Sequence, residues 1–389
     1  MSNTSSGHSS RVFGLDLLRF LAITLVLIEH GSLYMAVAEA VERLFLIFGY
    51  FGVELFFVLS GFLIGTIILN LYESEQRLSF GLIKNFWIRR WFRTIPLYYL
   101  ILTLNIVVHE LFGSSAYSDT TYLSFYAFAQ NAVTPQPGFF GEAWSLSVEE
   151  WFYLSLPLVL MLFDRGLPGR SFSVKTKTLW SLIFFLAVIL ALRITVVQMF
   201  DPAWNSGVRK MMLLRLDSIL VGVFFSWLNY YYRSFFTKGR YYFLLAGLCL
   251  TSCASYIYYH DIYQSAAAGF FSKTLYFTLT DIGLALLLPA ALHFRIKSPG
   301  PISKAVTHIS LISYSIYLIH QSVILKFLTL FGNPDSLLSS ILFCMAYLGL
   351  TLIASSLLYT YFELPVTNLR EKFRRKQPKQ VVPLAPVTP

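Results

Sequence analysis

The chain has 389 residues, of which 56% are hydrophobic and only 13% are charged, and its mean hydropathy is +0.62. Soluble proteins carry about 25% charged residues. This composition excludes a soluble globular protein and predicts an all-α polytopic membrane protein. The formal net charge of +10 comes mainly from the loops between apolar segments. We therefore expect the lipid bilayer, and no nucleic acid, as the partner of these basic residues.

Ten apolar segments are long enough to cross a bilayer as helices, which takes about 20 residues each. A polar tail, residues 1–10, precedes the first segment, and a basic tail with prolines, residues 371–389, follows the last. Residues 11–370 are therefore expected to form one transmembrane domain. The ten predicted spans are residues 13–36, 45–70, 94–112, 144–163, 178–200, 211–230, 241–260, 273–294, 307–331 and 336–362.

The basic residues are distributed unequally between the two sides of the predicted membrane. If both termini are cytoplasmic, the cytoplasmic segments carry 22 lysines and arginines, whereas the outer loops carry four. The positive-inside rule therefore favours ten spans with both ends of the chain in the cytoplasm. The longest outer loop, residues 113–143, has no lysine or arginine. It either enters the membrane and caps an outer cavity, or simply connects two spans.

Several ionisable residues lie within predicted spans, where a charge is costly and is a functional hypothesis by default. His30 is the most informative of them, because the first span also carries Asp16, Arg19 and Glu29. On a helix, Asp16, Arg19 and His30 share one face, and Arg19 and His30 are about 16 Å apart along the axis. This pattern predicts a polar track through the membrane.

The predicted topology divides the buried charges into two groups. The expected outer group comprises His30, Glu54, Glu149, Glu150, Arg193, Arg215, Asp217 and His320. The expected inner group comprises Asp16, Arg19, Arg89, Arg90, Arg93 and Glu363. For any single residue, a structural ion pair between helices is an equal alternative. The number of charges in each group favours a polar cavity.

An arginine-rich stretch, residues 86–98, lies where the third predicted span begins. Planar guanidinium groups suit phosphates, so a phosphate-bearing donor such as coenzyme A would fit here; a plain juxtamembrane anchor is the alternative. We expect no metal site, because no histidine, cysteine or carboxylate spacing indicates one. The three cysteines, Cys249, Cys253 and Cys344, lie in apolar segments, where a packing role is expected.

Seven motifs in this order resemble the acyltransferase 3 family of integral membrane acyltransferases, which includes O-antigen and peptidoglycan O-acetylases. The motifs are GLDLLR (14–19) with His30, FGVELFFVLSGF (51–62), RWFR (90–93) with Pro96, WSLSVEEWFY (144–153), RLDS (215–218), SYSIYLIH (313–320) and FELP (362–365). The resemblance covers residues 11–370. Glu29 is a departure, because family members more often carry an uncharged residue before this histidine.

The resemblance implies transfer of an acyl group, usually acetyl, from acyl-coenzyme A to a hydroxyl, often on a sugar. Acetyl-coenzyme A would be a donor substrate, and no permanently bound cofactor is expected. Arg19, Arg90 and Arg93 would hold the phosphates of the donor. The expected partners are acyl-coenzyme A, a carbohydrate or lipid-linked carbohydrate and the bilayer, and the expected location is a bacterial inner membrane.

His30 is the expected general base, because an unperturbed imidazole has a pKa of about 6.5, which suits proton abstraction at neutral pH. Glu149, Glu150 or Glu29 would orient the imidazole, as a carboxylate does in a catalytic triad. Arg215 would stabilise the oxyanion. A transient acyl-histidine stays open as a two-step alternative. The other expected cavity residues are Asp16, Glu54, Asp217 and His320.

Two other classes of function compete with this interpretation. A proton-coupled carrier of a small solute would also need intramembrane charges. A membrane receptor or scaffold without catalytic activity would not need His30 at all. Within the enzyme class, a lipid or a small metabolite could replace the carbohydrate as acceptor, and a homo-oligomer stays open.

Overall fold

The computed structural model describes most of the chain and leaves out both tails. Within the described residues, the chain is helical and contains no strand, which confirms the predicted all-α class. Most of the two predicted tails lies outside these residues. The described residues are 11–34, 39–112, 117–166, 172–264, 267–296 and 298–373.

Short π-helical and 3₁₀ turns join or extend many of the helices. The helices are α1 (Phe13–Ser32), α2 (Glu39–Glu75), α3 (Phe80–Phe112), α4 (Asp119–Tyr126), α5 (Ala143–Gly166), α6 (Val174–Phe200), α7 (Leu216–Tyr231), α8 (Arg233–Lys238), α9 (Arg240–Ile257), α10 (Phe270–Lys273), α11 (Leu275–Ala285), α12 (Leu288–His293), α13 (Pro301–Ile319), α14 (Lys326–Thr329), α15 (Leu337–Leu358) and α16 (Leu364–Asn368).

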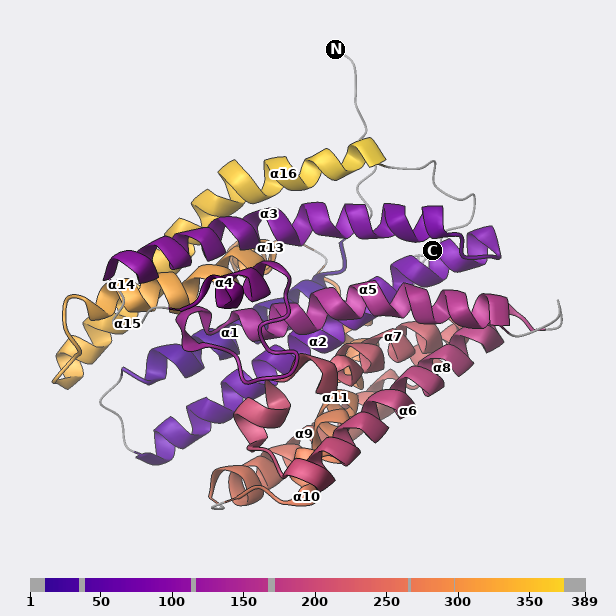
Figure 1. Cartoon of the computed structure of the whole chain (residues 1–389), viewed down its shortest axis with the longest axis horizontal. Coiled ribbons are helices and arrows are strands. Elements are labelled where there is room, and N and C mark those ends of the chain that lie inside the picture. Colours follow the sequence, from indigo (N-terminus) through magenta and orange to yellow (C-terminus); the bar gives the residue numbers. More distant parts are fainter. Residues whose placement is uncertain are drawn as a thin grey trace, which may run out of the picture.

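Nine helical segments in the described part of the chain are long and apolar enough to cross a membrane, and each matches a predicted span. The remaining predicted span, the first in the chain, corresponds to helix α1. Helix α1 is not among the nine segments, and its 20 residues include the ionisable Asp16, Arg19, Glu29 and His30. The long helices pack into one bundle, with α3 and α16 along one flank and α6, α8 and α9 along the opposite flank (Figure 1). The cytoplasmic position of both termini stays a prediction.

Helix α3 begins earlier than the sequence predicts. The hydroxyl of Ser79 accepts a hydrogen bond from the N–H of Leu82 and caps the helix start, so the helix begins at Phe80 rather than at residue 94. Arg90 and Arg93 therefore lie about 15–20 Å inside a helix, given a rise of 1.5 Å per residue. This places both arginines within the bundle and not at its edge.

Helices α2 and α7 form the centre of the bundle and approach each other very closely. A Cβ atom at Gly61 would overlap the carbonyl oxygen of Ile219, and one at Gly222 would overlap that of Val58. Small residues allow this approach, as is typical of helix pairs in membranes. Next to the contact, the hydroxyls of Thr66 and Ser226 are 2.9 Å apart and hydrogen-bonded. The contact holds together the two helices that carry Glu54 and Arg215.

Helix α1 packs against α2, α12 and α13, and this packing sets the position of His30. A Cβ atom at Gly14 would overlap the backbone of Ala291 on α12, and one at Gly52 would press on the carbonyl oxygen of Ala22. Ile23 and Val26 are fully buried in the face against these neighbours. The face that was predicted to be a polar track is therefore polar at its ends and apolar in the middle.

The segment between α3 and α5 packs back onto the bundle as a cap. Within its described residues, helix α4 is tied to α3 by the hydroxyls of Tyr98 and Tyr99, which donate to the carbonyls of Phe125 and Tyr126. Asn131 is fully buried, and its amide donates to the carbonyls of Trp144 and Lys210. The sequence left open whether this segment caps the bundle or only connects two spans, and these contacts support a cap.

The glycine contact between α2 and α7 can be tested by substitution. We expect Gly222→Leu to abolish the folded protein or lower its melting temperature in detergent by more than 10 °C, about the effect of a severe core overpacking. Gly349→Ala on α15 is the matched control, because no heavy atom lies near a Cβ placed there. Equal melting temperatures for both variants would contradict the close approach.

Candidate active site

Three arginines from two helices surround a narrow cavity inside the bundle. Arg19 comes from α1, and Arg90 and Arg93 come from α3. The cavity has a volume of about 100 Å³ and runs between α2, α3, α5 and α13. The guanidinium of Arg90 lies 4.7 Å from the centre of the Tyr153 ring, which fixes its direction. Of α1, this cavity touches Arg19. It therefore does not follow the face of α1 that was predicted to form a polar track.

The positive charge of this cavity is not balanced by the protein. Glu149 is the one carboxylate on its wall, against three guanidinium groups. Among the described residues, no carboxylate lies within ion-pair distance of Arg19, Arg90 or Arg93. All three arginines are half-buried, and a cation that is partly shielded from water is disfavoured without a counter-charge. The cavity is therefore suited to an anionic ligand.

A second cavity opens from the narrow one toward the end of the bundle where α1 begins, which we call the basic end. Its volume is about 370 Å³, and it shares Arg19 and Arg93 with the narrow cavity. Asp16 lines it, accepting hydrogen bonds from Arg11 at 2.7 Å and from Ser310 at 2.8 Å. Glu363 also lines it and accepts from Ser315 at 2.6 Å. The structure thus brings Asp16, Arg19, Arg93 and Glu363 of the expected inner group together around one opening. Arg90 lines only the narrow cavity, and Arg89 lines neither cavity and pairs with Glu371.

His30 and His320 form a pair at the other end of α1, which we call the histidine end. Nδ1 of His30 lies 3.4 Å from Nε2 of His320, and the ring centres are 5.0 Å apart in an edge-to-face arrangement. His320 is fully buried, whereas the side chain of His30 is 19% exposed. The pair adjoins the narrow cavity through Tyr317, whose ring is 5.7 Å from that of His320 and lines the cavity.

The hydrogen bonds around this pair select one tautomer of each neutral ring. Nδ1 of His320 faces the carbonyls of Tyr317 and Ile316, at 2.7 and 3.2 Å, so it must donate, which leaves Nε2 as an acceptor. Nδ1 of His30 faces that Nε2 and the carbonyl of Val26, at 3.0 Å, so it must donate as well. The lone pair of His30 is therefore on Nε2, the atom that a general base uses.

Glu29 is the carboxylate beside His30. Its Oε2 lies 3.9 Å from Nδ1 of His30, close enough to stabilise an imidazolium but too far for a hydrogen bond. The carboxylate rests against α2 at Gly49, where any Cβ atom would overlap it. The residue that departs from the family pattern is therefore placed by a glycine and acts on His30 electrostatically.

Arg209 is a further candidate residue, which lies in the predicted loop between the spans 178–200 and 211–230. It belongs to a buried π-helical turn, Trp204–Arg209, and its guanidinium lies 5.3 Å from the ring centres of both Tyr50 and Trp144. Within the described residues, no carboxylate is within ion-pair distance of it. Only its position in the folded protein reveals it, because loop charge alone predicts a solvated residue.

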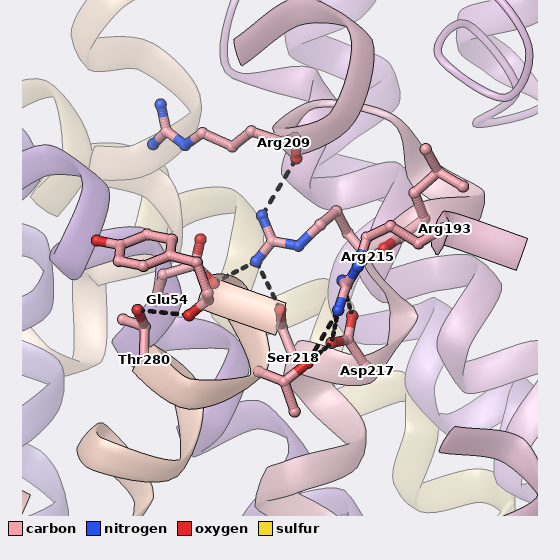
Figure 2. Close-up of polar contacts among 10 residues, drawn as sticks. Glu54, Arg193, Arg209, Arg215, Asp217, Ser218 and Thr280 are labelled. Atoms are coloured by element: carbon pink, nitrogen blue, oxygen red, sulfur yellow. Dashed lines mark hydrogen bonds and ion pairs between the residues drawn. The ribbon is translucent and has the colours of Figure 1, made fainter. Parts of the chain in front are cut away.

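Arg215 holds the backbone of Arg209 in place (Figure 2). Its Nη2 donates to Oε2 of Glu54 and to the hydroxyl of Ser218, both at 2.6 Å, while Nη1 reaches the carbonyl of Arg209 at 3.4 Å. Figure 2 also shows the Arg209 side chain extending away from this contact. Arg215 is therefore a positioning residue in this geometry.

A second ion pair lies beside the first. Nη1 and Nη2 of Arg193 both donate to Asp217 at 2.9 Å (Figure 2). The hydroxyl of Thr278 accepts from Arg193 at 2.9 Å and donates to Asp217 at 2.6 Å. Arg193 and Asp217 are fully buried. The two pairs join α2, α6, α7 and α11.

These contacts change the positions expected for part of the outer group. Glu54, Asp217 and Arg215 are fully buried in ion pairs and do not face the cavities described here. Glu149 lines the arginine cavity, and Glu150 accepts from Thr94 at 2.6 Å. Among the described residues, neither glutamate is bonded to His30. Because α3 begins early, its arginines Arg90 and Arg93 lie beside the part of α5 that carries these two glutamates.

Two buried groups outside the spans have shifted pKa values. Burial raises the pKa of Glu142 to about 7, although the backbone N–H of Ser322 donates to it at 3.0 Å. Burial and the neighbouring Arg209 lower the pKa of Lys210 to about 8. Both groups lie next to the histidine end, where Tyr317 donates to the carbonyl of Glu142 at 3.2 Å. Sequence patterns alone missed Glu142.

The fold and the cavities define a polytopic membrane protein in which a basic cavity extends from one end of the bundle toward a pair of histidines, with Tyr317 between the cavity and the pair. The acyltransferase domain family matches residues 12–360, nearly the whole chain. The protein therefore belongs to this family of membrane acyltransferase domains, which confirms the resemblance seen in the motifs.

Three bacterial relatives illustrate the similarity. The chain is 30% identical to the peptidoglycan O-acetyltransferase OatA of Listeria monocytogenes over 45% of its own length and 28% of the relative. It is 31% identical to the putative peptidoglycan O-acetyltransferase YrhL of Bacillus subtilis, over 40% and 24% respectively. For the O-acetyltransferase OatA of Staphylococcus aureus, the identity is 27%, over 54% and 33%. The aligned parts thus cover a quarter to a third of these relatives. No solved structure matches the chain.

The Glu54–Arg215 pair allows a test of its structural role. We expect Glu54→Gln to lower the free energy of unfolding by about 3–5 kcal/mol, because it leaves a buried guanidinium without a counter-charge. The double variant Glu54→Leu with Arg215→Met should regain most of this loss. Thermal unfolding in detergent measures both. Asp201→Asn is the control, since its carboxylate is 80% exposed and its pair with Lys273 should contribute about 1 kcal/mol or less.

Glu142 gives a pH-dependent contribution to stability. Because its folded pKa lies near 7 and an unfolded glutamate titrates near 4.3, the folded state binds more protons between these values. The stability contributed by this group should therefore fall as the pH rises from about 4.3 to about 7. Glu142→Gln should remove this part of the slope in melting temperature between pH 5 and pH 8. Identical slopes for wild type and variant would contradict the assignment.

Proposed function

We propose that this chain is a membrane-embedded O-acyltransferase that moves an acyl group, with acetyl expected, from cytoplasmic acyl-coenzyme A to a hydroxyl of a surface or exported carbohydrate. The observation that carries the proposal is the cavity lined by Arg19, Arg90 and Arg93, which has excess positive charge and leads toward the His30–His320 pair. The three relatives are named as O-acetyltransferases, which supports acetyl as the group, and two of them are named for peptidoglycan, which supports peptidoglycan-like glycans as the acceptor class.

The donor would enter from the basic end. Guanidinium groups bind phosphate through paired N–H donors, and the wider cavity offers Arg11, Arg19, Arg93 and Arg370. The narrow cavity would then hold the extended thiol arm. Since about 16 Å along α1 separate Arg19 from His30, an extended arm anchored at the arginines would bring its thioester to the histidines. The positive-inside rule places this basic end in the cytoplasm.

The chemistry follows from the tautomer of His30. Nε2 of His30 would accept the proton of the acceptor hydroxyl while the hydroxyl oxygen attacks the thioester carbonyl. Arg209 is a better candidate than Arg215 for stabilising the resulting oxyanion. The terminal nitrogens of Arg215 already donate to Glu54, to Ser218 and to the backbone of Arg209. Collapse of the tetrahedral intermediate breaks the C–S bond, and the imidazolium returns its proton to the departing thiolate. Glu29 would stabilise the imidazolium between these steps.

A direct transfer and a two-step transfer make different demands on the site. Direct transfer needs the donor thioester and the acceptor hydroxyl beside His30 together. An acyl-histidine would separate the two events, with Nε2 of His30 as the nucleophile.

The proposed location is the inner membrane of a bacterium, with both termini in the cytoplasm.

The decisive test uses membranes from cells that express wild type or His30→Ala at matched levels. Acetyl-coenzyme A with a labelled acetyl group is supplied, and base-labile label is measured in polysaccharide, lipid and small-molecule fractions. We expect label in the polysaccharide with wild type and its loss with His30→Ala. Equal label in both would remove His30 from the reaction, and label in the lipid fraction would change the acceptor class. Uptake of an unmodified solute, without label transfer, would favour a carrier.

Binding of the donor can be tested separately. We expect Arg93→Gln to weaken the binding of acetyl-coenzyme A by about tenfold, as expected for the loss of one charge-assisted contact worth about 1.5 kcal/mol. Binding to the wild type should weaken with added salt, and the variant should show a shallower salt dependence. Arg165→Gln, at an exposed position at the end of α5, is the control. Unchanged affinity in Arg93→Gln would contradict the proposed donor path.

A further inference from the structure

A third cavity lies at the histidine end, on the far side of Glu29 from His30. Its volume is about 620 Å³, and its walls come from the end of α1, from the turn Trp204–Arg209, from the π-helical turn Tyr258–Tyr263 and from α10. This size is typical of a site for a small ligand. The cavity is open on one side, which suits part of a longer molecule.

Aromatic rings form the deep part of this cavity. The rings of Trp204 and Tyr258 are 5.7 Å apart and nearly perpendicular, and each packs against the buried Tyr50. The indole N–H of Trp204 donates to the carbonyl of Ser272 at 2.9 Å, which fixes the ring. Tyr263, at the end of the same π-helical turn as Tyr258, is only half-buried. The cavity therefore has a buried aromatic floor and one partly exposed ring, that of Tyr263, which also packs on Tyr259 with ring centres 6.5 Å apart.

Charged groups line the same cavity. Arg209 is only 8% exposed and reaches the oxygen of Asn205 at 3.3 Å, and it has no carboxylate partner in the described part of the chain. Lys273 and Asp201 form an ion pair of 2.5 Å at the rim. Aromatic faces with hydrogen-bonding charges around them match a pyranose ring, which has apolar C–H faces and a belt of hydroxyls.

Glu29 connects this cavity to the proposed base. It lines the cavity, and its carboxylate is 3.9 Å from Nδ1 of His30. A sugar ring held against Tyr263 would therefore present its hydroxyls one side chain away from the imidazole. Arg209 lies between the two regions, because its guanidinium lines the third cavity and contacts Trp144, whose ring packs on Phe57 of the arginine cavity.

We propose that this third cavity is the acceptor site and binds a hexose ring of a glycan, with Tyr263 as the stacking surface and Arg209 as a hydrogen-bond donor to the ring. The inference rests on the proposed acyltransferase function, since it assigns the acceptor position of that reaction. It separates the acceptor path at the histidine end from the donor path at the basic end.

The test uses the full chain in detergent and a fluorescently labelled β-1,4-linked tetrasaccharide of N-acetylglucosamine as the probe. Binding is measured by anisotropy without donor, and transfer is measured by mass spectrometry with acetyl-coenzyme A. We expect Tyr263→Ala to weaken sugar binding and raise the KM for sugar by about tenfold, the upper range for one stacking ring. The affinity for acetyl-coenzyme A should not change, which also shows that the variant is folded.

Two further variants keep the result specific. Tyr263→Phe retains the ring and should bind the sugar almost as the wild type does. Tyr256→Ala, about two turns of helix away and 64% exposed, lies outside the cavity and should have no effect. Sugar binding or KM values that are equal in Tyr263→Ala and Tyr256→Ala would overturn the acceptor site while leaving the acyltransferase function intact. Ring-dependent binding without any transfer would support the site and contradict the function. Neither binding nor transfer by the wild type would overturn both.

Discussion

Each guanidinium that is buried in this bundle needs a counter-charge, and the way in which that need is met divides the arginines into two kinds. Arg193 and Arg215 are fully buried and paired with Asp217 and Glu54 at 2.9 and 2.6 Å. A buried pair of this kind is broken only at a high cost, so these arginines hold helices together. The buried Arg209 and the half-buried Arg19, Arg90 and Arg93 have no carboxylate within ion-pair distance in the described ranges. We infer that the substrate supplies the negative counter-charge that the protein does not.

The paired and unpaired arginines are physically linked. Arg215 holds the carbonyl of Arg209, and Arg209 contacts Trp144 at the start of α5, the helix that carries Glu149. The rigid contact between α2 and α7, made possible by Gly61 and Gly222, keeps Glu54 and Arg215 together. Stability and function therefore use the same type of residue for different purposes. The paired arginines build a frame, and the unpaired ones line the spaces inside it.

The sequence predicted the all-α class, the positions of the spans and the inner group around Asp16, Arg19 and Glu363, because hydropathy and intramembrane charge are local signals. It could not separate structural from cavity-facing charges. Glu54 and Asp217 were expected beside His30, and both are closed in ion pairs. Whether a buried charge is paired depends on which helices become neighbours, and that information is not local.

Helix boundaries account for the other differences. The early start of α3 moves Arg90 and Arg93 to the level of Glu149, and the buried turn Trp204–Arg209 moves an assumed loop residue into the bundle. The His30–His320 pair and the tautomer that it selects join residues 290 positions apart. Such contacts become visible only in three dimensions. Glu29, unexplained by the family pattern, gains a role from Gly49 on α2.

We infer that one donor path runs from the basic end, through the arginine cavity, to the histidine pair. The most direct measurement is photocrosslinking with an acetyl-coenzyme A analogue that carries a diazirine near its thioester, followed by mass spectrometry of the labelled peptides. We expect labels on α5 and α13, near Ser145 and Tyr317, and their loss when unlabelled acetyl-coenzyme A is in excess. Competed labels confined to the lipid-facing helices α6 and α9, with none on α5 or α13, would contradict it.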